Sequence, residues 1–464
     1  MSETPAHTEL PAENTSVLPA EPAPGNEDVI DGETHALEWH APVLVRIDEH
    51  TTIPHLLAKR VQRAPRRPLI ARKLEMGSTW QNMTAAEFYE DVQTTAAGLI
   101  GLGLNYGDAI AIMSRTRYEW TLLDFAAWTA GLLPVPIYET SSGEQIEYII
   151  KDADVRAIVT ETVTQRELAL DACHRLGKDD ITVLSLDAEA MQTIRDAGIT
   201  VPRASVAART QALTTDTLAT IVYTSGTTGR PKGTEITHGN FTELALNSHA
   251  WMPEIAMGQD SRLLLFLPLA HVFARFLQVF QLSGEGILGH TPDIKNLLSD
   301  LATFKPSYLL VVPRVLEKIY NSADAKAGRG GKQKIFRWAA NVAVEYSQAL
   351  ETPEGPSRRL KMQHAAATRL VYSKILQLVG GNAHYIISGG APLALDLANF
   401  YRGLGITLLQ GYGLSETTGP ISVETPQDFP PDSVGFPWPG NRMKIAPDGE
   451  LLVQGISVSK GYHN

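Results

Sequence analysis

The pattern of apolar and polar positions alternates between strand-like and helix-like segments from about residue 84 onward. Ala109–Met113 and Leu218–Thr224 are short, largely apolar runs of the kind that form buried strands. The same pattern predicts further strands at Leu133–Tyr138, Arg156–Thr160, Ile181–Leu186, Leu263–Leu267, Tyr308–Val312, Tyr385–Ser388 and Thr407–Gln410. Helix-like segments such as Gly143–Asp154 separate these strands, which indicates parallel sheets covered on both faces. We therefore predict an α/β fold with doubly wound, mostly parallel sheets and a small β-rich portion near the carboxyl end.

Three regions depart from this alternation. Residues 1–38 contain five prolines and several acids, and no Lys or Arg precedes Arg46, so we expect a disordered, acidic tail. Residues 321–374 contain ten Lys and Arg against four acids and no strand pattern, which predicts a Gly-interrupted loop followed by a basic helical insert. Residues 434–464 are rich in Gly and in short alternating runs, which predict β-hairpins. We expect one large domain over residues 39–464.

The composition narrows the class of protein. Hydrophobic residues make up 44% and charged residues 20% of the 464 positions, which is ordinary for a globular chain. A net charge of −11 argues against nucleic acid as a partner. The single cysteine, Cys173, cannot form an internal disulfide, and the most apolar stretch, Phe125–Tyr138, is shorter than the ~20 residues of a membrane span. We expect a cytoplasmic protein, and no pattern indicates its oligomeric state.

The strongest chemical signal follows the predicted strand Leu218–Thr224. Three glycines in the segment 223–233 permit close approach of a ligand to the backbone, and the neighbouring hydroxyls and a lysine add donors and a cation. The residues of this cradle are Thr224, Ser225, Gly226, Thr227, Thr228, Gly229 and Lys232. The segment differs from a Walker P-loop, because Pro231 stands where that motif requires Gly. We interpret it as a polyanion site, with a triphosphate as the favoured ligand.

Two further segments follow predicted strands. In the first, Tyr412 offers a flat ring for a base, Ser415 a hydroxyl for a phosphate, and Glu416 a hard oxygen ligand for Mg²⁺. The other candidate ligand-binding residues of these two segments are Gln410, Gly411, Gly413, Gly389, Gly390, Ala391 and Pro392, of which the last four predict a backbone wall for a planar ring. Open α/β sheets bind ligands at the carboxyl ends of their strands, which both segments follow. Each segment alone is equally typical of a tight turn.

These motifs, in this order, resemble the adenylate-forming, AMP-binding superfamily and, within it, the long-chain fatty-acid–CoA ligases. The resemblance extends from about residue 50 to residue 464 and is most specific at 223–233, with supporting matches at 267–275, 411–419 and 449–455. It implies that the segment 224–229 and Lys232 hold the phosphates of ATP and that Tyr412 lies beside adenine. It also implies that Glu416, with Thr224, binds Mg²⁺ and that His271 borders the acyl site. The expected catalytic residues are therefore Lys232, His271 and Glu416.

The implied reaction has two halves. A fatty-acid carboxylate attacks the α-phosphorus of Mg·ATP to give an acyl-adenylate and pyrophosphate, and the thiol of coenzyme A then displaces AMP. Because the first nucleophile is already an anion, no general base is needed, and catalysis should rest on alignment and electrostatic stabilisation. The expected cofactors and substrates are ATP, Mg²⁺, coenzyme A and a fatty acid.

Other functions stay open beside this one. Amino-acid-activating domains share the phosphate loop, but the segment 267–276 has no acid that could hold a substrate ammonium group. A fatty-acyl-AMP ligase that delivers to a carrier protein, and a non-catalytic ATP- or acyl-binding protein, remain as alternatives.

Two further expectations concern the domain that follows in the family and the basic insert. The family pattern continues beyond residue 464 into a small mobile domain with a catalytic lysine, so we expect this chain to lack that lid and to be impaired in acyl-CoA synthesis. The basic insert 321–374 predicts peripheral contact with anionic lipid at the inner face of the membrane, and the simpler interpretation is a solvated helical face.

Overall fold

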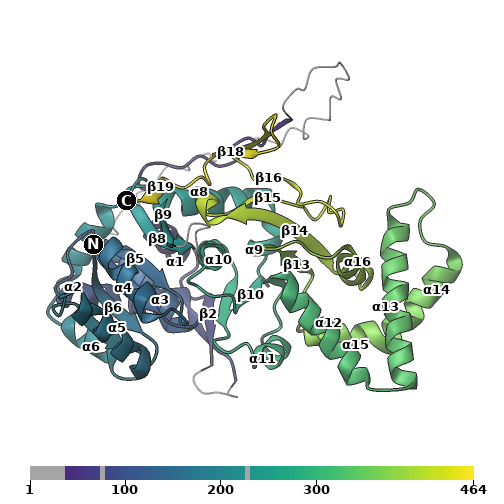
Figure 1. The fold of residues 1–464 in the computed structure, drawn as a ribbon, viewed down its shortest axis with the longest axis horizontal. Coiled ribbons are helices and arrows are strands. Elements are labelled where there is room, and N and C mark those ends of the chain that lie inside the picture. The colour runs from purple at the N-terminus through teal and green to yellow at the C-terminus, as the bar shows by residue number, and fades with distance from the viewer. Residues whose placement is uncertain (1–36, 74–78, 225–229) are drawn as a thin grey trace, which may run out of the picture.

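The computed structural model describes residues 37–73, 79–224 and 230–464, and two parallel sheets organise them (Figure 1). The first is a four-stranded sheet with the spatial order β5 (Leu133–Ile137), β4 (Ala109–Met113), β6 (Val155–Thr160) and β7 (Thr182–Ser185). Its helices are α2 (Ala85–Gly101), α3 (Tyr118–Thr129), α4 (Gly143–Asp152), α5 (Val163–Arg175), α6 (Ala190–Ala197) and α7 (Arg203–Gln211). Because side chains alternate along a strand, Ala111 faces α4 and α5 while Ile112 faces α2 and α3. Both faces of this sheet are therefore covered.

The second sheet has nine strands. In spatial order they are β16 (Phe436–Pro437), β15 (Gly419–Val423), β14 (Thr407–Leu414), β13 (Tyr385–Ser388), β12 (Tyr308–Val311), β10 (Arg262–Leu265), β11 (Ile287–His290), β2 (Pro68–Arg72) and β3 (Gln81–Thr84). The strands from β14 to β2 run parallel, and β3, β15 and β16 add antiparallel edges. The predicted fold class is confirmed.

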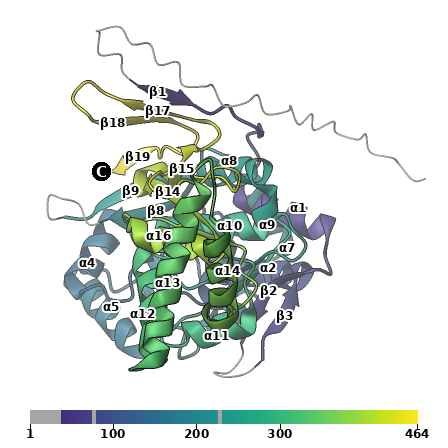
Figure 2. The ribbon, with the colours of Figure 1, turned by 90° about the vertical axis from the view of Figure 1, so that its right-hand side faces the viewer.

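Helices cover both faces of the nine-stranded sheet. On one face lie α1 (Ile53–Arg63), α8 (His238–Trp251), α9 (Pro253–Ala256) and α10 (Val272–Ser283). On the other face lie α11 (Leu297–Phe304), α12 (Pro313–Ala327), α13 (Gly331–Leu350), α14 (Arg358–Ala367), the π-helical turn η1 (Thr368–Tyr372), α15 (Ser373–Leu378) and α16 (Leu395–Gly403). In Figure 2 the helices of this second face, α13 in particular, lie toward the viewer. Residues 321–327, expected as a loop, belong to α12.

Two small antiparallel sheets complete the fold. One pairs β8 (Leu218–Thr224) with β9 (Lys232–Thr237) and β9 with β19 (Gly461–His463). The other joins β1 (Glu38–His40) to the hairpin of β17 (Asn441–Ile445) and β18 (Leu451–Gly455). A short 3₁₀ turn, η2 (Ser415–Thr417), lies between β14 and β15.

The start of α8 corrects one sequence-based expectation. The sequence pattern after the phosphate loop leads toward a helix that Asn240 could cap, but β9 intervenes and Thr237 is the cap residue. The Thr237 hydroxyl accepts a hydrogen bond from the Asn240 N–H, and the Asn240 side chain accepts one from the Thr237 N–H. Asn240 is thus the distal partner of a capping box, three residues inside the helix.

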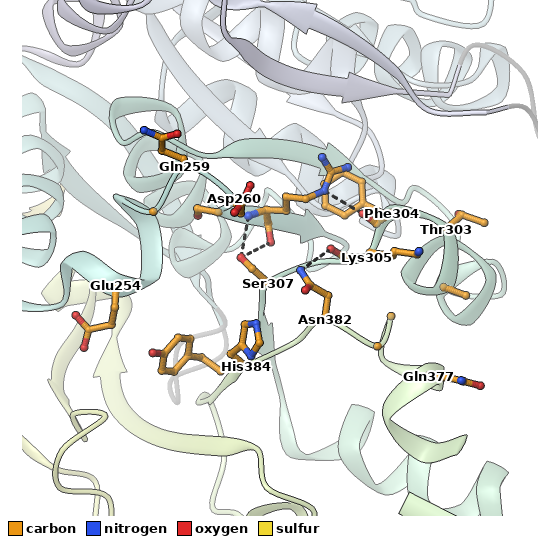
Figure 3. A pocket seen from close by; sticks show the side chains of 17 residues that line it. Glu254, Gln259, Asp260, Thr303, Phe304, Lys305, Ser307, Gln377, Asn382 and His384 are labelled. Atoms are coloured by element: carbon orange, nitrogen blue, oxygen red, sulfur yellow. Dashed lines mark hydrogen bonds between the residues drawn. The ribbon is translucent and has the colours of Figure 1, made fainter. Parts of the chain in front are cut away.

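A polar groove of about 1250 Å³ opens at the amino ends of the central parallel strands (Figure 3). Arg262 at the start of β10, Ser307 before β12 and His384 before β13 contribute to its wall. The predicted ligand segments follow the carboxyl ends of the strands, so this groove lies at the opposite edge of the sheet.

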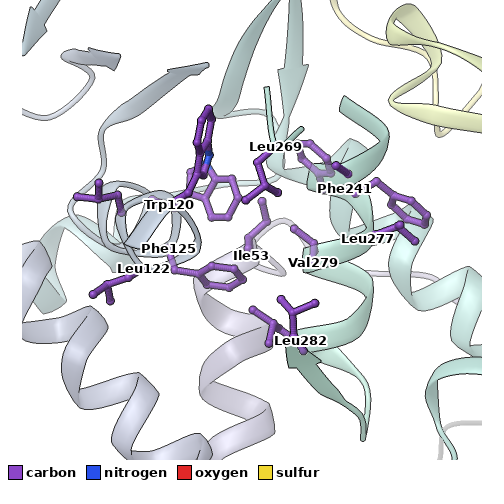
Figure 4. Packing of buried hydrophobic residues seen from close by; sticks show 14 of the residues in the cluster. Ile53, Trp120, Leu122, Phe125, Phe241, Leu269, Leu277, Val279 and Leu282 are labelled. Atoms are coloured by element: carbon purple, nitrogen blue, oxygen red, sulfur yellow. The ribbon is translucent and has the colours of Figure 1, made fainter. Parts of the chain in front are cut away.

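One apolar core connects the two large sheets (Figure 4). Ile53 of α1, Phe125 of α3, Phe241 of α8 and Val279 of α10 are fully or almost fully buried in it. Side chains from β4 and from β10 belong to the same cluster. The two sheets therefore share a core, and Ala219 and Val222 of β8 belong to the same cluster, which holds β8 against both sheets.

Candidate active site

The phosphate-loop candidate begins at the end of β8 and ends at the start of β9. Strand pairing places Thr224 opposite Lys232, and the Lys232 side chain is exposed. Ser225, Gly226, Thr227, Thr228 and Gly229 lie outside the described residues. The end of β8 is anchored to α4, because the Tyr223 hydroxyl donates to Asp152 Oδ2 at 2.6 Å. The described residues of the cradle therefore stand on a fixed strand pair.

Tyr462 brings two predicted site residues together. Its hydroxyl donates to Glu416 Oε1 at 2.5 Å, and Lys232 Nζ lies 4.9 Å from the centroid of its ring. The hydrogen bond to Glu416 raises the pKa of the Tyr462 hydroxyl above its ordinary value, so this hydroxyl remains a donor at neutral pH. The structure thus places a cation and a carboxylate from segments about 180 residues apart around one aromatic ring.

Backbone pairing holds Tyr462 in this place. β19 pairs with β9, and the Ser459 N–H donates to the Glu416 carbonyl at 2.8 Å. His463 Nδ1 lies 2.7 Å from Glu235 Oε1 on the neighbouring strand. Sequence reasoning missed Tyr462, because a tyrosine in a Gly-rich stretch carries no motif, and its contact with Glu416 spans 46 residues.

The Gly389 and Gly411 segments come together with the start of α10. A side-chain carbon at Gly389 would lie 3.3 Å from the Gly411 carbonyl and 3.3 Å from the Phe273 ring. Gly390 has a φ of +80°, which favours glycine. Ala391 and Pro392 follow on the surface, and Tyr412 is 38% exposed. The carboxyl ends of β13 and β14 therefore form a tight backbone surface beside an accessible aromatic ring.

His271 is the N-cap residue of α10, two positions before Phe273. Its Nδ1 accepts a hydrogen bond from the Phe273 N–H at 3.2 Å. The surrounding protein partly desolvates the ring and lowers the pKa of His271, so the imidazole is neutral at pH 7. The ring remains accessible, which argues against a purely internal packing role.

The chain matches the family model described as "AMP-binding enzyme" over residues 57–463. The chain belongs to the AMP-binding enzyme family. It is 39% identical over 427 residues to the long-chain-fatty-acid–CoA ligase FadD15 of Mycobacterium tuberculosis, with 92% of this chain and 70% of the relative covered. It is 28% identical to the long-chain-fatty-acid–CoA ligase ACSBG2 of Rattus norvegicus, with 90% and 67% covered.

Two solved structures agree with this chain in fold. A fatty acyl CoA synthetase of Mycobacterium tuberculosis superposes with a TM-score of 0.66 at 20% identity, covering 90% of this chain and 72% of that one. VinN superposes with a TM-score of 0.66 at 19% identity, covering 90% and 92%. At such identities the likeness concerns the fold alone.

A buried carboxyl group lies behind the AMP-binding candidate segment 410–416. Glu424, the residue after β15, is fully buried, and its Oε2 accepts the Gln410 N–H at 2.6 Å. Desolvation raises the pKa of Glu424 to about 8. The Gln410 side chain donates to the Pro431 carbonyl at 2.8 Å, so its amide anchors a loop. Sequence reasoning missed Glu424, because a single acid after an apolar run resembles a surface residue.

The predicted phosphate contact Ser415 lies in η2 beside Glu416 and is partly accessible.

Proposed function

We propose that this AMP-binding enzyme activates a long-chain fatty acid with ATP and then transfers the acyl group to coenzyme A. The observation that carries the proposal is the meeting of Lys232 and Glu416 around Tyr462 at the end of β8. The reaction class is supported by the 39% identity to FadD15, which is named a long-chain-fatty-acid–CoA ligase.

In the first half-reaction, a carboxylate oxygen forms a bond to the α-phosphorus while the bond to the bridging oxygen of pyrophosphate breaks. The second half-reaction forms the thioester, releases AMP and leaves the thiol proton to solvent. Lys232 is exposed beside Thr224 and supplies positive charge where phosphate oxygens would lie. Tyr412 offers its ring to adenine, with Gly389 and Gly411 forming the adjacent backbone surface.

Mg²⁺ fits the donor set of this site. Among residues 37–73, 79–224 and 230–464, no three His, Cys, Asp or Glu side chains form a complete metal site. Mg²⁺ usually binds one or two carboxylates together with substrate phosphates, and Glu416 offers a partly accessible carboxylate beside Lys232. Glu416, with Thr224 as a second oxygen, would hold the ion, which supplies charge neutralisation on the phosphates when bound.

The surroundings of α10 favour an acid without an amino group. Asp124 of α3 is a buried acid that contacts this helix, because it pairs with Arg275 of α10 at 2.7 Å and both side chains are fully buried. Its charge is therefore neutralised and unavailable to a substrate ammonium group. His271, neutral and accessible at the helix start, would border the acyl chain.

The test is ATP–pyrophosphate exchange with fatty acids of graded length, followed by an assay of thioester formation with coenzyme A. We expect exchange that depends on a long-chain acid and is lost in Lys232→Ala. The matched control Lys151→Ala removes an exposed lysine of α4 and should exchange as the parent does. Exchange with transfer to a carrier protein in place of coenzyme A, or ATP binding without exchange, would contradict the proposal.

A further inference from the structure

The region Arg358–Lys374, formed by α14, η1 and the start of α15, presents an unusual surface. Over these 17 positions the chain has five cations and no acid, in a protein whose net charge is −11. The five exposed cations are Arg358, Arg359, Lys361, Arg369 and Lys374. None of them forms an ion pair within the described part of the chain. We call the exposed side of this region the α14 stripe.

Two long apolar side chains lie among these cations. Met362 is 76% exposed and Leu370 is 52% exposed. Arg358, Met362, Ala365 and Arg369 follow one another at intervals of four, three and four residues, so they share one side of the helix. The α14 stripe therefore combines positive charge with exposed apolar groups.

The opposite side of the helix is anchored. The His364 ring stacks on Tyr346 of α13 with 3.9 Å between centroids, and its Nε2 lies 2.7 Å from the Gly403 carbonyl. Farther along, the Tyr372 hydroxyl donates to the Ala339 carbonyl at 2.7 Å. The orientation of the stripe toward solvent is thus set by packing, and Figure 1 shows α13 and α14 at the end of the molecule far from the four-stranded sheet.

The stability of α14 does not explain why cations occupy its first turns. Arg358, Arg359 and Lys361 occupy the first turns of α14, where the positive end of the helix dipole disfavours positive charge. The first turn has no acid that would offset them. A group of opposite charge from outside the chain would relieve this repulsion.

We propose that the α14 stripe binds the surface of an anionic lipid bilayer, with phosphate headgroups against the cations and Met362 and Leu370 inserted at the interface. Helices that lie in a membrane interface combine Lys and Arg with exposed apolar residues in this way. No helix in the described part of the chain is long and apolar enough to span a membrane. An acidic protein partner would also match the cations, and no recovery with either type of vesicle is the outcome that would favour it over a bilayer.

The test is flotation of the whole chain with vesicles of phosphatidylcholine alone or of phosphatidylcholine mixed with phosphatidylglycerol, without ATP or fatty acid. Its outcome is therefore independent of the proposed ligase activity. We expect recovery with the anionic vesicles only, and release at high salt. Because each cation near an anionic surface contributes about fivefold to partitioning, the loss of three cations in Arg358→Gln/Arg359→Gln/Lys361→Gln should lower the partition coefficient about 100-fold.

Two matched variants separate the stripe from the overall charge. Arg66→Gln/Lys151→Gln/Arg195→Gln removes three exposed cations elsewhere and should bind vesicles as the parent does. Met362→Ser/Leu370→Ser keeps the charge and should weaken binding while leaving its salt dependence intact. All substituted side chains are exposed, and unchanged thermal unfolding checks the fold of each variant. Equal recovery with both vesicle types, no recovery with either, or equal loss in the stripe variant and the Arg66 control would overturn the proposal.

Discussion

Charged side chains are handled differently in the shared core and at the end of β8. In the core, Arg275 is fully buried and donates to Asp124 Oδ1 at 2.7 Å and to the Thr220 hydroxyl at 2.5 Å. Gln278 donates to the second Asp124 oxygen at 2.6 Å. Every oxygen of this carboxylate has a partner from the protein, so nothing is left for a ligand.

At the end of β8, Lys232 and Glu416 are bridged by a neutral hydroxyl and ring rather than paired directly. Both side chains are accessible, and each keeps bonding capacity for a ligand. The comparison teaches that opposite charges serve architecture where the protein buries them and pairs them directly with each other. Opposite charges are available to a ligand where the protein holds them around a shared neutral group without a direct ion pair, as Tyr462 holds Lys232 and Glu416.

The largest expected effect is on the core pair. Arg275→Met leaves the Asp124 carboxylate buried without its cation, and breaking a buried pair in this way costs about 3–5 kcal/mol of unfolding free energy. Denaturant unfolding measures this difference. The control is Arg203→Met, which breaks the exposed Arg203–Glu90 pair and should change stability by at most about 1 kcal/mol. A similar loss in both variants would show that Arg275 is not structurally distinct.

Glu416→Gln tests the accessible charges at the end of β8. The change keeps the size of the side chain and removes the charge that would attract Mg²⁺. Because losing even a residue behind a metal ligand costs about 10–100-fold, we expect Mg²⁺-dependent nucleotide affinity to fall at least about tenfold, with little change in stability. Calorimetric titration with and without Mg²⁺ measures it. An unchanged response to Mg²⁺ would assign the ion to another residue.

The sequence predicts the buried strands well and the polar ones poorly. Ala109–Met113 and Leu218–Thr224 are strands with the predicted bounds, because burial on both faces demands continuous apolar runs. The sequence pattern does not predict β9, Lys232–Thr237, because four of its six residues are polar. The same reason applies to α12, because the polar residues at its carboxyl-terminal end are also typical of a loop.

The candidate site shows a similar division. Lys232, Glu416 and Gly389 stand out because they belong to local motifs that follow strands. Tyr462 and Glu424 are recognised as site residues only by their contacts with distant segments, and no local sequence pattern predicts such contacts. The structure was needed to find which residues orient the motif residues, and it brings Gly389, Gly411 and Phe273 together without a sequence signal for their approach.

Glu424 sharpens the comparison, because it is a buried acid that forms no ion pair with the described residues 37–73, 79–224 and 230–464. Its pKa is raised from 4.5 to about 8, so the folded chain holds a proton that the unfolded chain releases between these values. Stability should therefore fall as the pH rises from about 4.5 to about 8, by up to about 1.4 kcal/mol per pH unit, and level off above. Glu424→Gln should remove this slope, measured by denaturant unfolding across the range. Glu450→Gln, at an exposed acid of the β17–β18 hairpin, should leave the slope in place.

The smallest expected effect concerns the bridge itself. Tyr462→Phe removes the hydroxyl that donates to Glu416 but keeps the ring beside Lys232. A hydrogen bond to a charged group at an accessible site contributes about 1 kcal/mol, so affinity for Mg·ATP should fall about two- to tenfold. Tyr462→Ala also removes the ring and should weaken binding further, by the cation–π contribution of about 0.5–1 kcal/mol. Titration of both variants with Mg·ATP gives the two contributions separately. If Tyr462→Phe binds more tightly than the parent, the hydroxyl competes with the ligand for Glu416, and the bridge holds the two charges apart from the ligand instead of presenting them to it.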